Sequence, residues 1–173
     1  MRRSDMEALI RAIPDFPIPG ILFRDITPLL YDKQGFAAAV DMMAEAYADQ
    51  RIDRVVAIEA RGYILGAPIA YKLGAGFVPV RKPGKLPFEK VSVDYALEYG
   101  TNTLEMHKDA IVKGERVLLV DDLLATGGTA AATRSMLERF GAHVVGIAFL
   151  IELTALDGRS KLAGVDVRSF ITY

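Results

Sequence analysis

Two adjacent carboxylates followed by a turn of small residues are the groups in this sequence best suited to chemistry. Asp121 and Asp122 follow the apolar run Val117–Val120, and the turn A-T-G-G-T at 125–129 begins two residues later. A glycine-rich turn that opens a helix binds phosphate, because its backbone N–H groups point outward and glycine lets the anion approach. Two carboxylates would repel a phosphate. We therefore expect them to face something else, such as sugar hydroxyls.

The elements around this stretch are a strand and a helix. Val117–Val120 is an uninterrupted apolar run, which is typical of a strand buried on both faces of a parallel sheet, and the two acids stand where that strand should end. Residues 130–140 have a helical pattern, and Gly141 is a suitable stop. A P-loop needs a lysine where Thr129 stands, and the G-x-G-x-x-G of dinucleotide-binding folds is absent. The alternative is an ordinary buried strand followed by a glycine-rich loop.

Length and composition limit the class of protein. The chain has 173 residues, 51% of them hydrophobic, with a formal net charge of −1 and no cysteine. This size favours one domain with a substantial core. The charge argues against a nucleic-acid partner, and the lack of cysteine excludes disulfides and thiolate metal sites. No apolar run is long enough to cross a bilayer, so we expect no membrane partner and a cytoplasmic location.

Most of the chain alternates between strands and helices. Strands are predicted at 54–58, 76–80, 144–153 and 165–171, and helices at 36–48, 63–73 and 157–162. This alternation predicts the α/β class, with a parallel-sheet core flanked by helices. Ligands of such sheets bind at the carboxyl ends of the strands, where Arg61, Arg81 and Lys82 also fall.

Two segments depart from that alternation. Ser4 and Glu7 have capping-box spacing, which predicts a helix from Ser4 to Pro14. Residues 91–107 alternate between apolar and polar side chains, which predicts an antiparallel hairpin inserted into the domain. Residues 82–90 are rich in proline, glycine and lysine, so they form a loop or a lid.

Five motifs in order resemble a known family. The segment V-D-D-L-L-A-T-G-G-T at 120–129 is similar to the PRPP-binding signature of type I phosphoribosyltransferases. Within that family, four further segments resemble the adenine phosphoribosyltransferases: F-P-I-P-G-I-L-F-R-D-I-T-P at 16–28, E-A-R-G-Y at 59–63, V-R-K-P-G-K-L-P at 80–87 and L-E-Y-G at 97–100. The resemblance implies transfer of the phosphoribosyl group of PRPP to adenine, giving AMP and pyrophosphate. It also implies one domain over 1–173, with a hood over the base at 1–35 and a lid loop and hairpin at 82–107.

The resemblance also assigns roles to residues of this chain. Adenine would contact Leu22, Phe23 and Arg24, and catalysis would use Glu98 and Arg61. Mg²⁺ is expected through substrate oxygens and without direct protein ligands, a homodimer is expected, and the Glu59–Ala60 peptide is expected to be cis. PRPP would be bound by Arg61, Arg81, Lys82, Lys85, Asp121, Asp122, Ala125, Thr126, Gly127, Gly128 and Thr129.

Simpler interpretations of these residues stay open. Glu98 can be a solvated carboxylate on a strand, and residues 81–85 a loop that aids solubility. Ala125 stands where phosphoribosyltransferases for 6-oxopurines have an aspartate, and alanine cannot exchange a proton, which favours adenine. A phosphoribosyltransferase for another purine base and a non-catalytic PRPP-sensing regulator remain as alternatives.

Overall fold

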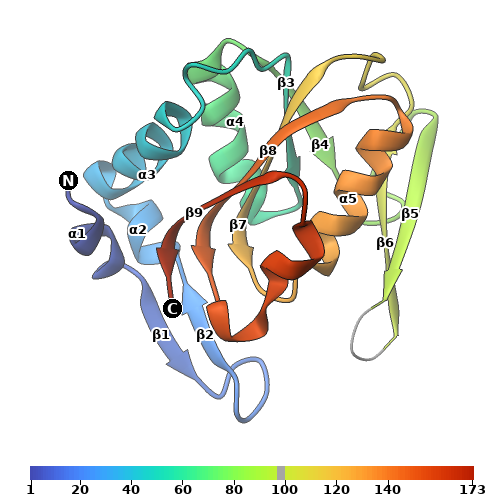
Figure 1. The fold of residues 1–173 in the computed structure, drawn as a ribbon. Helices are drawn as coiled ribbons and strands as arrows, with labels where there is room; N and C mark the ends of the chain where they lie inside the picture. The colour runs from blue at the N-terminus through green and yellow to red at the C-terminus, as the bar shows by residue number, and fades with distance from the viewer. Residues whose placement is uncertain (97–99) are drawn as a thin grey trace.

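A five-stranded parallel sheet is the centre of the molecule (Figure 1). The computed structural model describes residues 1–96 and 100–173. The sheet order is β4-β3-β7-β8-β9, and every neighbouring pair is parallel, which confirms the predicted fold class. The strands are β3 (Arg54–Ile58), β4 (Gly76–Val80), β7 (Arg116–Leu124), β8 (His143–Glu152) and β9 (Asp166–Thr172).

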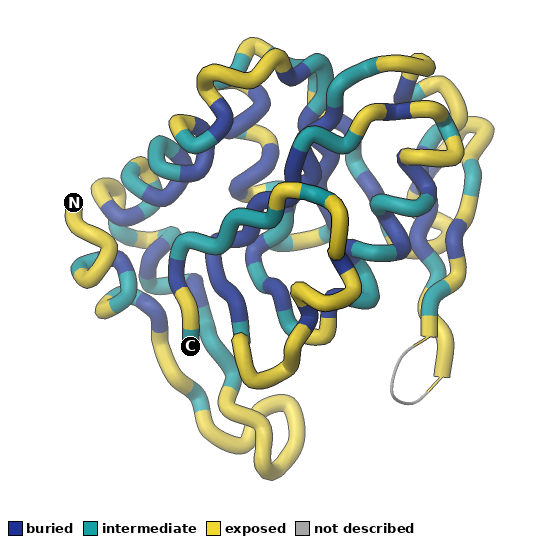
Figure 2. Tube along the Cα trace, in the orientation of Figure 1, coloured by how far each residue is buried: buried dark blue, intermediate teal, exposed yellow. Residues whose placement is uncertain are grey.

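Helices cover both faces of this sheet. On one face, α3 (Lys33–Glu45) and α4 (Arg61–Leu73) form a core with Leu118 and Val120 of β7. On the other, α5 (Gly128–Arg139) packs against the alternate β7 residues Val117 and Leu119. All four of these β7 side chains are fully buried. Figure 2 colours the buried stretches of the central strands dark blue. The uninterrupted apolar run therefore exists because β7 serves two cores.

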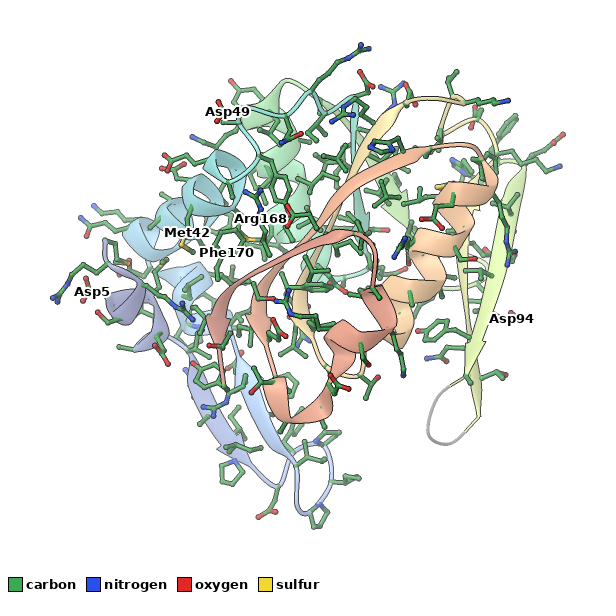
Figure 3. The ribbon with its side chains drawn as sticks, in the orientation of Figure 1. Asp5, Met42, Asp49, Asp94, Arg168 and Phe170 are labelled. Carbon is green, nitrogen blue, oxygen red and sulfur yellow. The ribbon has the colours of Figure 1, made fainter. Side chains whose placement is uncertain are left out.

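β4 and β9 are the two edge strands of the sheet, and β9 is packed against α3. Phe170 of β9 and Met42 of α3 pack against the same core (Figure 3). The guanidinium of Arg168 lies over the Tyr47 ring, 4.6 Å from its centre, and donates to the carbonyl of Ala46. These contacts join the C-terminal strand to the end of α3.

The central strand is longer than its apolar run. Asp121 and Asp122 were expected to follow the strand, but β7 continues to Leu124. The reason is the partner strand: β8 stays paired with β7 as far as Leu124↔Glu152, whereas the pairing of β3 with β7 ends at Ala57↔Val120. The two acids therefore lie on the part of β7 that has a neighbour on one side only.

The helix predicted from Ser4 to Pro14 is wrong beyond its first turn. α1 spans Arg3–Glu7, and Asp5, rather than Glu7, accepts the N–H of Arg2 that precedes the helix (3.0 Å). β1 (Arg11–Pro14) then pairs antiparallel with β2 (Leu22–Asp25). Helical periodicity is a local signal, and here the pairing of residues 11–14 with residues 22–25 overrides it. The short α2 (Thr27–Tyr31) connects this hairpin to α3.

The hairpin predicted within 91–107 is present. β5 (Lys90–Ala96) pairs antiparallel with β6 (Thr101–His107), and Val93, Leu104 and Met106 are buried beside α5. The short helix expected near 157–162 is the 3₁₀ helix η2 (Gly158–Leu162), which follows η1 (Thr154–Leu156). Among the described helices, none combines the length and apolar character that a bilayer crossing needs.

Candidate active site

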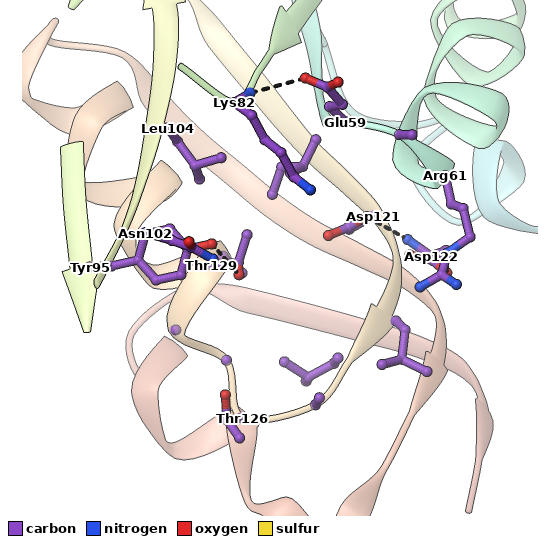
Figure 4. Close-up of a pocket in the computed structure, with 18 of the residues that line it drawn as sticks. Glu59, Arg61, Lys82, Tyr95, Asn102, Leu104, Asp121, Asp122, Thr126 and Thr129 are labelled. Carbon is purple, nitrogen blue, oxygen red and sulfur yellow. Dashed lines mark hydrogen bonds and ion pairs between the residues drawn. The ribbon is translucent and has the colours of Figure 1, made fainter. Parts of the chain in front are cut away.

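A cavity of about 780 Å³ opens where β3 and β7 end (Figure 4). This is the carboxyl edge of the sheet, where ligands of parallel α/β folds bind. The described lining comes from the β3–α4 connection, the loop after β4, the β5–β6 hairpin, the end of β7 with the β7–α5 connection, and Phe149 of β8. The lining residues with polar side chains are Glu59, Arg61, Lys82, Tyr95, Thr101, Asn102, Thr103, Asp121, Asp122, Thr126 and Thr129.

The small-residue turn forms the floor of this cavity. α5 begins at Gly128, and Gly127 precedes it with φ of +77°, a conformation that favours glycine. The turn is pressed against η2: a Cβ at Gly127 would lie 2.3 Å from the carbonyl oxygen of Gly158, and a Cβ at Gly158 would lie 2.2 Å from that of Ala125. No side chain fits between the two glycines. The first N–H groups of α5, which lack carbonyl partners in the helix, are thereby held at the cavity.

The two acids differ in their surroundings. Asp122 is 5% exposed and forms an ion pair with Arg61, whose Nε lies 2.7 Å from Oδ2. Asp121 accepts the backbone N–H of Asp122 at 2.9 Å. Loss of hydration and the adjacent Asp122 carboxylate raise the pKa of Asp121 well above its ordinary value. Burial also raises the pKa of Asp122, against the opposing effect of Arg61.

Glu59 organises the base of the lysine-rich loop. Its carboxylate accepts the backbone N–H of Lys82 at 3.0 Å and two N–H groups of Arg81, from Nε at 3.2 Å and Nη2 at 3.3 Å. These contacts, the Lys82 N–H first among them, lower the pKa of Glu59. The Lys82 side chain extends into the cavity (Figure 4). The expected cis peptide at Glu59–Ala60 is present.

The structure brings together only part of the predicted set. Arg61, Lys82, both aspartates and all of 125–129 line the cavity, whereas Arg81 and Lys85 do not. Instead of reaching the cavity, the Arg81 side chain is held by Glu59 and by the carbonyl of Lys85 (3.3 Å). Glu98 lies outside the described residues.

The residues predicted to contact adenine lie on β2, next to the cavity. The Phe23 ring is 5.3 Å from the guanidinium carbon of Arg61, so β2 reaches the cavity rim. Arg24 instead stacks on Tyr173, 3.6 Å from the ring centre, and Leu22 is 48% exposed.

Two residues of the β5–β6 hairpin line the cavity although the sequence did not predict them there. Tyr95 and Asn102 line the cavity, and the Tyr95 hydroxyl accepts a hydrogen bond from Thr129 Oγ1 at 3.3 Å. Alternation assigned Tyr95 to the apolar face of β5 and gave no sign that its hydroxyl meets the turn at 125–129. Only the packing of β5 on α5 brings the two together.

Known proteins match this chain over its whole length. The model of the phosphoribosyl transferase domain family matches residues 29–170. The adenine phosphoribosyltransferase of Thermotoga maritima is 56% identical over 173 residues, which is all of both chains. The crystal structure of the Thermoanaerobacter pseudethanolicus adenine phosphoribosyltransferase has a TM-score of 0.97 at 53% identity, over 99% of this chain and 100% of that one. The chain belongs to the adenine phosphoribosyltransferase family.

The match to adenine phosphoribosyltransferases covers more of this chain than the match to the general phosphoribosyl transferase domain does. The general domain match begins at Leu29, after the β1–β2 hairpin, whereas the Thermotoga maritima relative aligns over the whole chain. The Saccharomyces cerevisiae adenine phosphoribosyltransferase, whose crystal structure is a complex with an imino-altritol bisphosphate and adenine, has a TM-score of 0.91 at 38% identity, over 97% of both chains. The N-terminal hairpin is thus a feature held in common with adenine phosphoribosyltransferases and lies outside the general domain match.

Proposed function

We propose that this protein transfers the 5-phosphoribosyl group of PRPP to N9 of adenine, giving AMP and pyrophosphate in purine salvage. One observation carries the proposal: in a chain 56% identical to an adenine phosphoribosyltransferase, the turn at 125–129 and the Asp121–Asp122 pair face one cavity. The proposal treats 1–173 as one catalytic domain, with 1–35 as a hood over the base and 82–107 as lid loop and hairpin.

The 5-phosphate of PRPP is assigned to the floor of the cavity. Backbone N–H groups at the start of α5 and the hydroxyls of Thr126 and Thr129 are donors suited to a phosphate. Gly127 and Gly128 leave room for close approach, and Ala125 completes the turn. The contact of Gly127 with Gly158 supports this role, because a rigid turn binds an anion without first having to be ordered.

The ribose and the leaving group are assigned to the charged walls. Asp121 and Asp122 accept hydrogen bonds from the ribose 2- and 3-hydroxyls and offset positive charge that develops on the ring as pyrophosphate departs. Arg61 and Lys82 stabilise the departing negative charge, and Arg61 also fixes Asp122. Lys85 joins them only if the loop that carries it moves inward, and Arg81 only if its side chain leaves Glu59.

Magnesium fits this arrangement through the substrate. The described residues contain no cluster of three carboxylates or histidines that could hold a metal ion. Mg²⁺ commonly keeps several waters and binds substrate phosphates rather than a cage built by the protein. When bound, the ion neutralises pyrophosphate charge. The ion would be held through oxygens of the bound PRPP, without a direct protein ligand.

Adenine is assigned to the space between β2 and the β5–β6 hairpin. Leu22, Phe23 and Arg24 would cover the base, which agrees with the sharing of the N-terminal hairpin with adenine phosphoribosyltransferases. Glu98 is proposed to exchange the proton at adenine N7 and N9, since Ala125 cannot. This role comes from the L-E-Y-G motif, because Glu98 lies outside the described residues.

The direct test is release of pyrophosphate from PRPP with a panel of purine bases and Mg²⁺. We expect turnover with adenine to exceed that with hypoxanthine, guanine and xanthine by orders of magnitude. Faster turnover with a 6-oxopurine would favour a different phosphoribosyltransferase. PRPP binding without release of pyrophosphate for any base would favour a sensor.

Closure of the loop is a further expectation. Residues 82–89 contain no helix or strand, and closure would shield the positively charged sugar from water and bring Lys85 to the pyrophosphate. PRPP together with an inert adenine analogue should therefore slow tryptic cleavage after Lys85 and Lys90. Cleavage after the exposed Lys33 is the internal control. Equal rates in both states would show that the loop does not close.

The homodimer is proposed to use an exposed apolar surface on α4 and the edge strand β4. Ile64 and Tyr71, seven residues apart on α4, are 41% and 88% exposed, and Phe77 of the edge strand β4 is 36% exposed. Tyr71→Glu should shift sedimentation toward the monomer, and Tyr31→Glu, at a site 80% exposed on α2, should not. An unchanged dimer in Tyr71→Glu would place the interface elsewhere.

A further inference from the structure

Glu105 is a buried carboxylate that does not line the cavity. It lies on β6, 6% exposed, between the apolar residues Leu104 and Met106. Its Oε2 accepts the backbone N–H of Gly84 at 3.0 Å and lies 3.5 Å from Nζ of Lys90. A buried charge is costly unless it is paired and hydrogen-bonded, so the groups that pair with Glu105 are informative.

The partners of Glu105 all belong to the loop after β4 or to its end. Its backbone N–H and carbonyl pair with Arg81 at 2.8 and 2.9 Å, and its carboxylate holds Gly84, whose φ is +78°. Lys90 is the first residue of β5, where the loop ends. Glu105 thus fastens both the beginning and the end of the segment 81–90.

The backbone around Lys82 is held at two points, one by Glu59 and one by Glu105. The Lys82 N–H is held by Glu59 at 3.0 Å, and Glu105 holds Gly84 two residues later. Pro83 between them restricts the backbone further. The Lys82 side chain is then directed into the cavity from a backbone fixed on both sides (Figure 4). Fixing a flexible lysine in advance lowers the entropy that binding an anion costs.

We propose that Glu105 is a positioning residue for the pyrophosphate end of PRPP, acting through Lys82, an inference that rests on the proposed function. Its carboxylate touches no substrate. By holding Gly84 and Lys90 it sets the path of the loop from which the Lys82 ammonium reaches the leaving group.

A double-mutant cycle tests this dependence on Lys82. Calorimetry gives the affinity for PRPP, and steady-state kinetics give kcat and the KM values for PRPP and adenine. Glu105→Ala should weaken PRPP binding by about tenfold and raise the KM for PRPP, while the KM for adenine changes less than about twofold. In a Lys82→Met background the same change should alter PRPP affinity by less than about twofold, because residues that act as a unit are not additive.

Two variants separate this role from general stability. Glu105→Gln keeps an acceptor for Gly84 N–H and should recover most of the PRPP affinity. Glu89→Ala is the matched control, because Glu89 is exposed in the same loop and pairs only with Lys108 among the described residues. Its PRPP affinity should equal that of the wild type. If Glu105→Ala does not fold, Glu105→Met preserves the side-chain length and takes its place.

Each outcome decides between the possibilities. Unchanged PRPP affinity in Glu105→Ala, or an equal loss in the wild-type and Lys82→Met backgrounds, overturns the inference while the enzyme remains an adenine phosphoribosyltransferase. A wild-type protein that neither binds PRPP nor forms AMP overturns the proposed function, and this inference with it.

Discussion

Replacing Glu98 with glutamine is expected to lower kcat by roughly 10²–10⁴-fold, the range over which a positioned acid or base contributes. Adenine must lose its N9 proton as the new bond forms, and Ala125 supplies no group that could take part. Glutamine keeps the length and the hydrogen-bonding oxygen of glutamate but cannot exchange a proton. Substrate binding should therefore change much less than turnover, with KM values within a few-fold of the wild type.

The control for this change is Glu89→Gln, which removes an exposed carboxylate from the loop that precedes the hairpin. Its kcat should equal that of the wild type. Turnover is followed by the absorbance change as adenine becomes AMP, with both substrates saturating. Wild-type kcat in Glu98→Gln would leave the proton to another group, and Tyr95 would then be the first side chain of the cavity to examine.

Removing either central acid is expected to weaken PRPP binding by about 10- to 100-fold. A charged acceptor for a hydroxyl contributes about 1.5–3 kcal/mol, and asparagine offers one neutral oxygen in its place. Asp122→Asn also leaves Arg61 without its 2.7 Å partner. Asp122 lies within β7 and is buried, so this variant needs a thermal unfolding measurement beside the calorimetry. Normal PRPP affinity in both variants would refute the assignment of the ribose site.

The same substitution at Asp121 should make the protein more stable. Burial and the Asp122 carboxylate raise the pKa of Asp121 in the folded protein above that of the unfolded chain. The folded state then holds more protons between the two pKa values, so the free energy of unfolding falls as pH rises through the folded pKa. Asp121→Asn lacks this cost. Near neutral pH its Tm should exceed that of the wild type, and the gain should shrink on acidification. A lower Tm near neutral pH would contradict this account.

Local pattern was sufficient for the central elements. The apolar runs at 54–58 and 117–120 predicted buried strands, and the small residues at 125–129 predicted a turn that opens a helix. The alternation in 91–107 likewise specified the hairpin. Arg61, Lys82, both aspartates and residues 125–129 of the predicted set therefore line one cavity.

Long-range contacts account for what the sequence did not predict. Residues 11–14 are a strand because β2 lies beside them, and β7 passes through both aspartates because β8 continues alongside. Arg81 faces Glu59 rather than the cavity, although a basic residue after a strand gives the same local signal in either orientation. The hydroxyl of Tyr95 meets Thr129 only through packing of the hairpin on α5.

The contact between Gly127 and Gly158 has a consequence for the newly made protein. The turn at 125–129 is supported by Gly158, which is synthesised after the turn itself. A nascent chain that ends before Gly158 has the whole A-T-G-G-T sequence but lacks the backbone surface against which the turn is packed. We therefore expect the proposed PRPP site to lack its support on such a chain. Because a ligand stabilises only the state that it binds, PRPP would protect finished molecules from unfolding and leave truncated ones to proteolysis.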